Sequence, residues 1–263
     1  GQPPRWVSCR GEQLKTRSGQ LLGALVLMHD ISEQKQLEQM KTDFISTVSH
    51  ELRTPITAIS GGLDLVINQV LGPVPEKALA MLKVAGQNSK RLQLLVNDLL
   101  DMEKLSAGKM DFCLQPCDLA VECQQAIAQN QPYADKFGVH LRILNTESVQ
   151  MQLDNHRLQQ VLSNLLSNAI KYSKAGAEVT LSYAQQGNKT RIQVEDKGEG
   201  IPLHFQEKVF QRFAQADGSD SKAKSGTGLG LAISKAIIES MGGSIGFHSV
   251  PGQGTVFFCD FPL

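Results

Sequence analysis

Two long stretches with apolar residues at helical spacing limit what this chain can fold into. Between residues 32 and 70 an apolar residue recurs every three or four positions, at Ile45, Val48, Leu52, Ile56, Ile59, Leu63, Val66 and Val70. Residues 75–105 repeat the pattern, at Leu79, Leu82, Ala85, Leu92, Leu95, Leu99 and Met102. This period is typical of amphipathic α-helices. The short "LGPVP" between the two stretches favours a helical hairpin.

A single hairpin of this kind is a poor core, because each helix covers only part of the other's apolar stripe. Two copies that form a four-helix bundle would bury both stripes. The sequence therefore predicts that residues 32–105 build a homodimer, and that "SAGK" at 106–109 is a linker.

The remaining segments alternate between helical and strand-like patterns. Residues 110–263 contain helical stretches near 118–136, 154–172 and 228–241, interleaved with the strand-like "VHLRIL", "VQMQL", "EVTLSYA", "TRIQVED", "GSIGFHSV" and "TVFFCDF". This predicts a two-layer α/β sandwich, so the fold class is α+β, a helical hairpin followed by a sandwich. Residues 1–31 contain two short strands, "WVSC" and "LLGALVLMH", separated by a turn-rich "GEQLKTRSGQ".

Composition narrows the classes of partner. Lys plus Arg equals Asp plus Glu, at 26 each, which gives no reason to expect nucleic acid or an anionic membrane surface. The longest apolar run, "LLGALVLM", is less than half of the ~20 residues that span a bilayer. A start at Gly1 without a signal-peptide pattern predicts a cytoplasmic fragment of a longer protein, whose missing part could be membranous.

The cysteines give no sign of a metal site or a disulfide framework. They are odd in number and form no C-x-x-C pair, which favours reduced, packed thiols in a cytosolic protein. The five positions are Cys9, Cys113, Cys117, Cys123 and Cys259.

The stretch "STVSHELRTP" places His50 on the first predicted helix, facing away from the apolar stripe. No H-x-x-x-H or E-x-x-H pattern supports a metal site. Glu51 is an adjacent carboxylate that suits a nucleophile, because imidazole attacks through one nitrogen while a base takes the proton from the other. Thr54 lies one turn along the same face, and Pro55 should bend the helix there. Taken alone, His50 is either a nucleophile or a solvated surface histidine.

The segment "NHRLQQVLSNLLSNAIKYS" places two carboxamides, Asn164 and Asn168, one helical turn apart, followed by Lys171 and Tyr172. Mg²⁺ that is bound to a polyphosphate takes few protein oxygens, a lysine supplies charge to the phosphates, and a tyrosine ring can lie beside a base. The alternative is a pair of asparagines with a purely structural role. The pattern favours a nucleotide site.

Two glycine-rich segments extend this hypothesis. In "VEDKGEGIP", Asp196 could accept a hydrogen bond from an exocyclic amine such as that of adenine, while Gly198 and Gly200 let the backbone close on the ring. "SGTGLGLAISKAIIESMGG" opens a helix whose amide N–H groups can meet phosphates. It is neither a P-loop nor a dinucleotide fingerprint. The candidate binding residues there are Gly226, Thr227, Gly228, Leu229 and Gly230.

In this order and spacing, the stretches resemble the H, N, G1, F and G2 boxes of sensor histidine kinases of two-component systems, over residues 32–262. The resemblance implies that His50 is the phosphoacceptor, Glu51 its general base and Thr54 the residue that positions water when a partner is dephosphorylated. It also implies that the phosphoryl group passes to an aspartate in the receiver domain of a response regulator.

For the second domain, the resemblance implies ATP as the nucleotide. Asn168 would hold Mg²⁺, with Asn164 and Lys171 near the phosphates, Tyr172 and Asp196 at the adenine, and the glycines 226, 228 and 230 in a lid hinge. The segment "VFQRFAQAD" matches the F box through Phe210 and Phe213, with Arg212 as a phosphate contact. One departure is Gln215, where many relatives carry Arg.

The implied domains are the tail of a PAS-like sensor domain at 1–31, the dimerisation and phosphotransfer hairpin at 32–105, and the catalytic ATP-binding domain at 110–263. Because His50 and Asn168 lie in different domains, the nucleotide domain must move for the reaction to occur. Two alternatives remain. One is an ATPase like those of gyrase and chaperones, and the other is a sensory dimerisation module with a degenerate nucleotide site.

Overall fold

The computed structural model describes residues 5–70, 72–215 and 226–263. The chain divides into two compact units, Gly1–Val96 and Asn97–Leu263, which are described separately below. The boundary lies inside the second long helix, ahead of the linker expected at 106–109.

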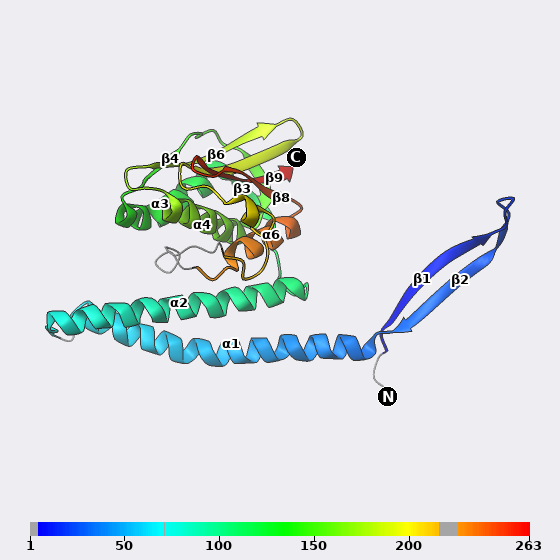
Figure 1. Ribbon diagram of the computed structural model, residues 1–263, viewed down its shortest axis with the longest axis horizontal. Helices are drawn as coiled ribbons and strands as arrows, with labels where there is room; N and C mark the ends of the chain where they lie inside the picture. The colour runs from blue at the N-terminus through cyan, green and yellow to red at the C-terminus, as the bar shows by residue number, and fades with distance from the viewer. Residues whose placement is uncertain (1–4, 71, 216–225) are drawn as a thin grey trace. The chain divides into compact units, whose positions relative to one another are not determined.

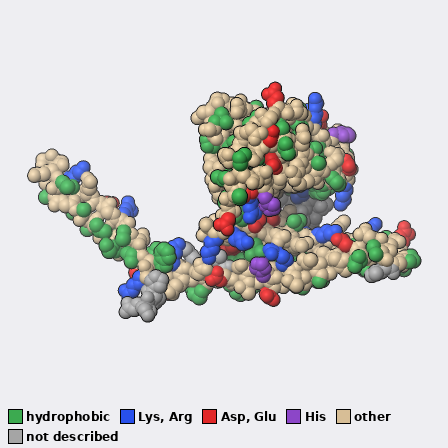
Figure 2. All heavy atoms as spheres, turned by 180° about the vertical axis from the view of Figure 1, so that it is seen from behind, with side chains coloured by type: hydrophobic (Ala, Val, Ile, Leu, Met, Phe, Trp, Pro, Cys, Tyr) green, Lys and Arg blue, Asp and Glu red, His purple; other side chains and the backbone are tan. Residues whose placement is uncertain are grey.

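The first unit begins with an antiparallel hairpin of strands β1 (Val7–Lys15) and β2 (Leu21–Asp30). The prediction that a turn begins at Gly11 is wrong, because the segment from Gly11 to Lys15 pairs with β2 and belongs to β1. Backbone hydrogen bonds to an apolar neighbouring strand extend β1 past residues that local propensity alone assigns to a turn. Both strands leave apolar side chains exposed, as Figure 2 shows for this hairpin.

Helices α1 (Ser32–Ile67) and α2 (Glu76–Ser106) confirm the predicted pair of long helices. Pro55 lies inside α1, which continues through it without a break. Polar contacts join α1 to α2 in the part of the chain that the structure describes. Ser60 Oγ lies 2.7 Å from Ser89 Oγ, and Lys90 Nζ donates to Asp64 Oδ1 at 2.8 Å.

The two helices leave much of their apolar surface uncovered. Ile56 and Val96 are buried in the first unit. Exposed apolar residues of the two helices include Val48, Leu52, Ile59, Met81, Val84, Leu92 and Leu94. Val70, which the periodicity placed on the stripe, lies beyond the end of α1 and is also exposed.

The second unit contains a five-stranded sheet in the order β4-β6-β7-β9-β8, with β4 parallel to β6 and the other pairs antiparallel. Its strands are β4 (His140–Ile143), β6 (Glu178–Gln186), β7 (Lys189–Asp196), β8 (Ser244–Val250) and β9 (Gly254–Pro262). A separate ladder pairs β3 (Gln115–Asp118) with β5 (Gln150–Leu153). The helices are α3 (Leu119–Phe137), α4 (Asn155–Tyr172), α5 (Leu203–Gln206) and α6 (Gly230–Ser240).

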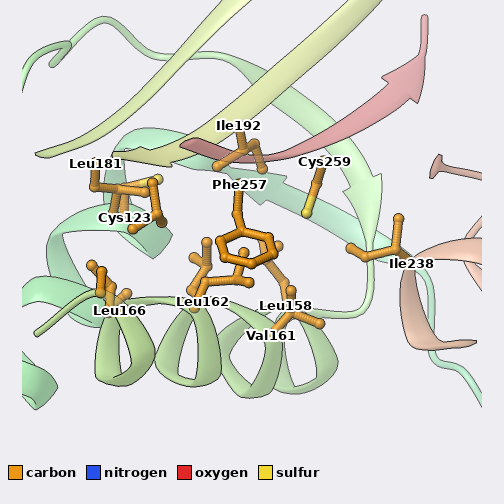
Figure 3. Packing of buried hydrophobic residues seen from close by; sticks show 14 of the residues in the cluster. Cys123, Leu158, Val161, Leu162, Leu166, Leu181, Ile192, Ile238, Phe257 and Cys259 are labelled. Carbon is orange, nitrogen blue, oxygen red and sulfur yellow. The ribbon is translucent and has the colours of Figure 1, made fainter. Parts of the chain in front are cut away.

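Helices α3, α4 and α6 pack together on one face of the sheet and form the second layer (Figure 1). Leu158, Leu162 and Leu166 of α4 point toward the sheet, where Phe257 and Ile192 meet them (Figure 3). The two-layer sandwich that the sequence predicted is therefore confirmed. The prediction missed β3, in which Pro116 argues against a strand, and α5, which is only about one turn of helix.

The last ten residues of α2 belong to this second unit. Met102, which the periodicity assigned to the hairpin stripe, is buried in the core cluster of the sandwich, and Leu105 packs against that cluster. An apolar period indicates which face of a helix is buried but not which partner covers it, and α2 has different partners along its length.

All five cysteines are free. Cys117, Cys123 and Cys259 are buried, and burial raises the pKa values of their thiols, to about 11 for Cys117 and about 12 for the other two. Cys9 and Cys113 are exposed, so the expectation of packed thiols is wrong for these two.

Across the residues that the structure describes, no helix combines the length and the apolar character that crossing a membrane requires.

Candidate functional site

His50 lies on the solvent side of α1 in the first unit. His50, Glu51 and Thr54 are all exposed, whereas Ser49 is only 2% exposed. The predicted orientation of His50 is confirmed. The helix therefore presents an imidazole, a carboxylate and a hydroxyl to solvent within about one turn.

In the second unit, the helix that carries the two predicted carboxamides is well defined. Asp154 caps the start of α4 by accepting a hydrogen bond from the Arg157 N–H at 3.0 Å. Asn164 Nδ2 donates to Ser234 Oγ of α6 at 2.9 Å, and Asn168 Nδ2 lies 3.5 Å from Asn164 Oδ1. The two carboxamides thus lie in contact, and one of them joins α4 to α6.

The end of α4 supplies a cation and an aromatic ring. Lys171 Nζ lies 4.8 Å from the centre of the Tyr172 ring. A Cβ added at Gly226 would lie 3.5 Å from the same Nζ, so the glycine-rich loop approaches Lys171 closely. The structure therefore places the positive charge of Lys171 beside Gly226 of this loop.

Asp196 ends β7 with its carboxylate buried, at 6% exposure. Burial raises the pKa of this carboxyl group, while hydrogen bonds from the Gly198 and Thr255 backbones oppose the rise. The Gly198 N–H donates to Asp196 Oδ1 at 2.8 Å. A buried carboxylate with an oxygen fixed by the backbone can accept a hydrogen bond from a ligand amine.

Gly198 has no room for a side chain. A Cβ there would collide with the Tyr172 carbonyl oxygen, so the loop after β7 lies directly against the end of α4. Gly200 adopts φ +68°, a conformation that L side chains rarely accept, and it lies against the Val250 backbone. These contacts place Asp196 and Tyr172 on neighbouring segments.

The glycine-rich loop before α6 packs tightly against two of the other segments. A Cβ at Gly230 would collide with Asn164 Oδ1 and lie 3.0 Å from its Cγ. Gly228, at φ +72°, would place a Cβ 2.8 Å from the Phe213 carbonyl carbon. Leu229 is buried in the core, so only its backbone is available to a ligand. Its N–H donates to Thr227 Oγ1 at 3.2 Å.

The F-box segment contains both residues that pack in the fold and residues that are exposed. The Phe210 ring lies 5.9 Å from that of Phe247, whereas Phe213 is exposed with φ +60°. Arg212 Nη2 donates to Ser106 Oγ of α2 at 2.8 Å. Gln215 Nε2 donates to the Gly226 carbonyl oxygen at 3.1 Å. The last two residues of "VFQRFAQAD", and most of the polar loop that the sequence predicts after them, lie outside the described residues.

Three residues at this site were missed by reasoning from the sequence: Ser234, which holds Asn164, and Asp98 and Ser106 of α2. Asp98 Oδ2 accepts a hydrogen bond from Thr227 Oγ1 at 2.8 Å. Nothing in the helical period of α2 distinguishes Asp98 from an ordinary solvated residue, because its partner lies 129 positions away.

The segments with the predicted nucleotide residues therefore converge around α4, while His50 belongs to the other compact unit. Among the described residues, no group of three or more His, Cys, Asp or Glu could hold a metal ion. Carboxamide oxygen is nevertheless a donor that suits Mg²⁺ when phosphates and waters supply the other ligands. The donor set around Asn168 fits a metal that arrives with a nucleotide.

Comparison with known families assigns both parts of the chain. Residues 40–108 match the His Kinase A (phospho-acceptor) domain, and residues 153–263 match the histidine kinase-, DNA gyrase B- and HSP90-like ATPases. The chain belongs to the sensor histidine kinases. Within residues 40–108, His50 is the exposed histidine that lies next to a carboxylate, Glu51.

Two curated sensor proteins extend the match to almost the whole chain. The alginate biosynthesis sensor protein KinB of Pseudomonas aeruginosa is 34% identical over 246 residues, which are 93% of this chain and 41% of KinB. The sensor protein SrrB of Staphylococcus aureus is 34% identical over 249 residues, 94% of this chain and 42% of SrrB. This histidine kinase chain thus spans about two fifths of the length of these relatives.

Solved structures of histidine kinases share the fold. Full-length ShkA in complex with AMPPNP superimposes with a TM-score of 0.67 and 28% identity, covering 84% of this chain and 45% of ShkA. The histidine kinase AdeS of Acinetobacter baumannii gives a TM-score of 0.58 and 26% identity, covering 81% of this chain and 97% of that one.

The packing of Gly230 against Asn164 generates a first prediction. Gly230→Ala is expected to weaken binding of ATP by about tenfold, because the added methyl group displaces the Asn164 amide from its place between α4 and α6. Isothermal titration calorimetry measures the affinity. Gly11→Ala, which adds the same methyl group in open space, is the control. Unchanged affinity in Gly230→Ala would show that the position of Asn164 does not matter for the nucleotide.

Proposed function

We propose that this chain is the catalytic region of an ATP-dependent histidine autokinase, which phosphorylates His50 and passes the phosphoryl group to an aspartate of a response regulator. The observation that carries the proposal is the convergence of Asn164, Asn168, Asp196 and the "GTGLG" loop, in a chain that presents an exposed histidine beside a carboxylate. Membership of the sensor histidine kinases and the match to AMPPNP-bound ShkA support it.

In this proposal, the residues around α4 bind and orient ATP. Asp196 accepts a hydrogen bond from the adenine amine, with the Tyr172 ring beside the base. Lys171 and the loop N–H groups meet the phosphates, and Arg212 offers a further cation once it leaves Ser106. Asn168, with Asn164 beside it, would hold Mg²⁺, which neutralises phosphate charge when bound. Gln215 carries no charge and instead donates a hydrogen bond to the Gly226 carbonyl oxygen.

The chemistry at His50 is a phosphoryl transfer. One imidazole nitrogen forms a bond to the γ-phosphorus as the bond from that phosphorus to the β–γ bridging oxygen breaks, and ADP leaves. The proton on the other ring nitrogen moves to Glu51, so the phosphorylated imidazole does not keep an extra positive charge. The exposure of both side chains allows this geometry without rearrangement of α1.

The proposed division of the chain follows the sequence prediction, with a PAS-like remnant at 1–31, the phosphotransfer hairpin at 32–105 and the catalytic domain at 110–263. The family matches at 40–108 and 153–263 support the second and third parts.

The central test uses γ-labelled ATP. We expect the chain to acquire acid-labile, base-stable phosphate, and His50→Gln to acquire none, because the nucleophile is removed. Addition of a chelator for Mg²⁺ should abolish labelling of the parent chain. Label that persists in His50→Gln would contradict the assignment of the phosphoacceptor. An ATPase of the gyrase and chaperone type would instead release all label as free phosphate.

The exposed apolar residues of α1 and α2 support a homodimer, in which two hairpins form a four-helix bundle. We expect a dimer in sedimentation analysis at micromolar concentration. Val48→Glu combined with Ile59→Glu places charge on the exposed apolar surface of α1 and should shift the equilibrium toward monomer. A parent chain that sediments as a monomer would rule out the bundle.

Thr54 generates a separate prediction. We propose that its hydroxyl orients a water toward the acyl phosphate of the response regulator, so that the same hairpin also dephosphorylates its partner. Thr54→Ala should keep most of the autophosphorylation and lose most of the phosphatase rate, because the nucleophile and Glu51 remain. Both rates are measured on one preparation. A parallel loss of both would mean that Thr54 serves only the helix before Pro55.

A further inference from the structure

The end of α2 contacts the F-box segment at Arg212 and the glycine-rich loop at Thr227. Asp98 Oδ2 accepts a hydrogen bond from Thr227 Oγ1 at 2.8 Å. Two turns further along α2, Ser106 Oγ accepts one from Arg212 Nη2, also at 2.8 Å. These four residues belong to one compact unit. Ser106 thus holds Arg212, which the proposed function assigns to the phosphates, and Asp98 holds the Thr227 hydroxyl, which belongs to the loop whose N–H groups the proposed function assigns to them.

The Thr227 hydroxyl can donate to Asp98 or to a phosphate, but not to both at once. A threonine hydroxyl has one proton to donate, and here Asp98 receives it, while the hydroxyl oxygen accepts from the Leu229 N–H at 3.2 Å. A phosphate oxygen could not receive the same hydrogen bond while Asp98 holds it. The Asp98 carboxylate would also repel a phosphate that lay within hydrogen-bonding distance of Thr227, since two negative charges would then lie beside one donor.

Asp98 depends on this hydrogen bond in turn. The residue is partly buried, and burial raises the pKa of its carboxyl group, whereas the Thr227 hydroxyl opposes the rise. A carboxylate that lost its donor without moving would stay desolvated and unpaired, which is unfavourable. Asp98 must therefore move toward water when another acceptor receives the hydrogen bond from the Thr227 hydroxyl.

We propose that Asp98 is an internal competitor of the nucleotide phosphates, so that the site binds ATP tightly only when the end of α2 releases Thr227. The inference rests on the proposed function, because it requires phosphates at Thr227. Helix α2 is unbroken from Glu76 to Ser106. A shift or rotation of this helix would therefore change nucleotide affinity directly.

The test is equilibrium binding of AMPPNP and of adenosine to the whole chain. Asp98→Ala should tighten AMPPNP binding by roughly tenfold, or about 1.4 kcal/mol, and leave adenosine binding within about twofold, because adenosine has no phosphate. Asp98→Asn keeps an acceptor but loses the charge, so it should give a smaller gain. If circular dichroism shows that the alanine variant does not fold, the asparagine variant is compared with the parent chain instead.

Two controls separate competition from a general loosening of α2. Asp101→Asn alters a carboxylate three residues along α2 that contacts Gln160 and Arg157 rather than Thr227, and it should leave AMPPNP affinity unchanged. In a Thr227→Val background, Asp98→Ala should give a smaller gain than in the parent chain, because no hydroxyl is left to compete for and only the charge repulsion is relieved.

Each outcome either supports the inference or overturns it. Unchanged or weaker AMPPNP binding in folded Asp98 variants would overturn it, as would an equal gain for adenosine or a gain that is undiminished in Thr227→Val. In all of these outcomes the parent chain still binds AMPPNP, so the proposed function stands. A parent chain that binds neither AMPPNP nor ATP would contradict the proposed function and this inference together.

Discussion

The contact between the Asn164 carboxamide and α6 organises the nucleotide site. Its Nδ2 donates to Ser234, and its Oδ1 touches both Asn168 and the position where Gly230 lacks a side chain. One amide therefore fixes the distance from α4 to the helix that follows the glycine-rich loop. Without a glycine at 230, the loop could not begin α6 at this distance, and the residues before it would not lie next to Lys171.

Much of this arrangement could be predicted from the sequence because its determinants are local. The period of three and four residues predicted α1, α2 and α4, and the orientation of His50 followed from its place relative to Val48 and Leu52. The convergence of Asn164, Asp196 and the loop at 226–230 was expected from the resemblance to histidine kinases, and no local pattern would have brought these segments together.

The features that could not be predicted depend on partners distant in the chain. Pairing with β2 keeps Gly11 to Lys15 in a strand, although these residues favour a turn. Met102 has the spacing of a bundle residue but is buried in the core of the sandwich. The role of Asp98 depends on a hydroxyl 129 positions away, and no pattern within α2 contains that information.

The passage of a single helix through the boundary between the two units has a consequence for how such chains can vary in length. Each residue added to α2 before Asp98 would turn this side chain by about 100° and advance it by about 1.5 Å relative to the preceding turns. Because Asp98, Met102 and Leu105 all belong to the second unit, one added residue would leave their contacts in place and would change the angular phase of the preceding turns, whereas seven would nearly restore that phase, because seven residues make almost two full turns. Insertions in α2 thus change its angular phase and its length separately, and steps of seven residues leave the phase almost unchanged.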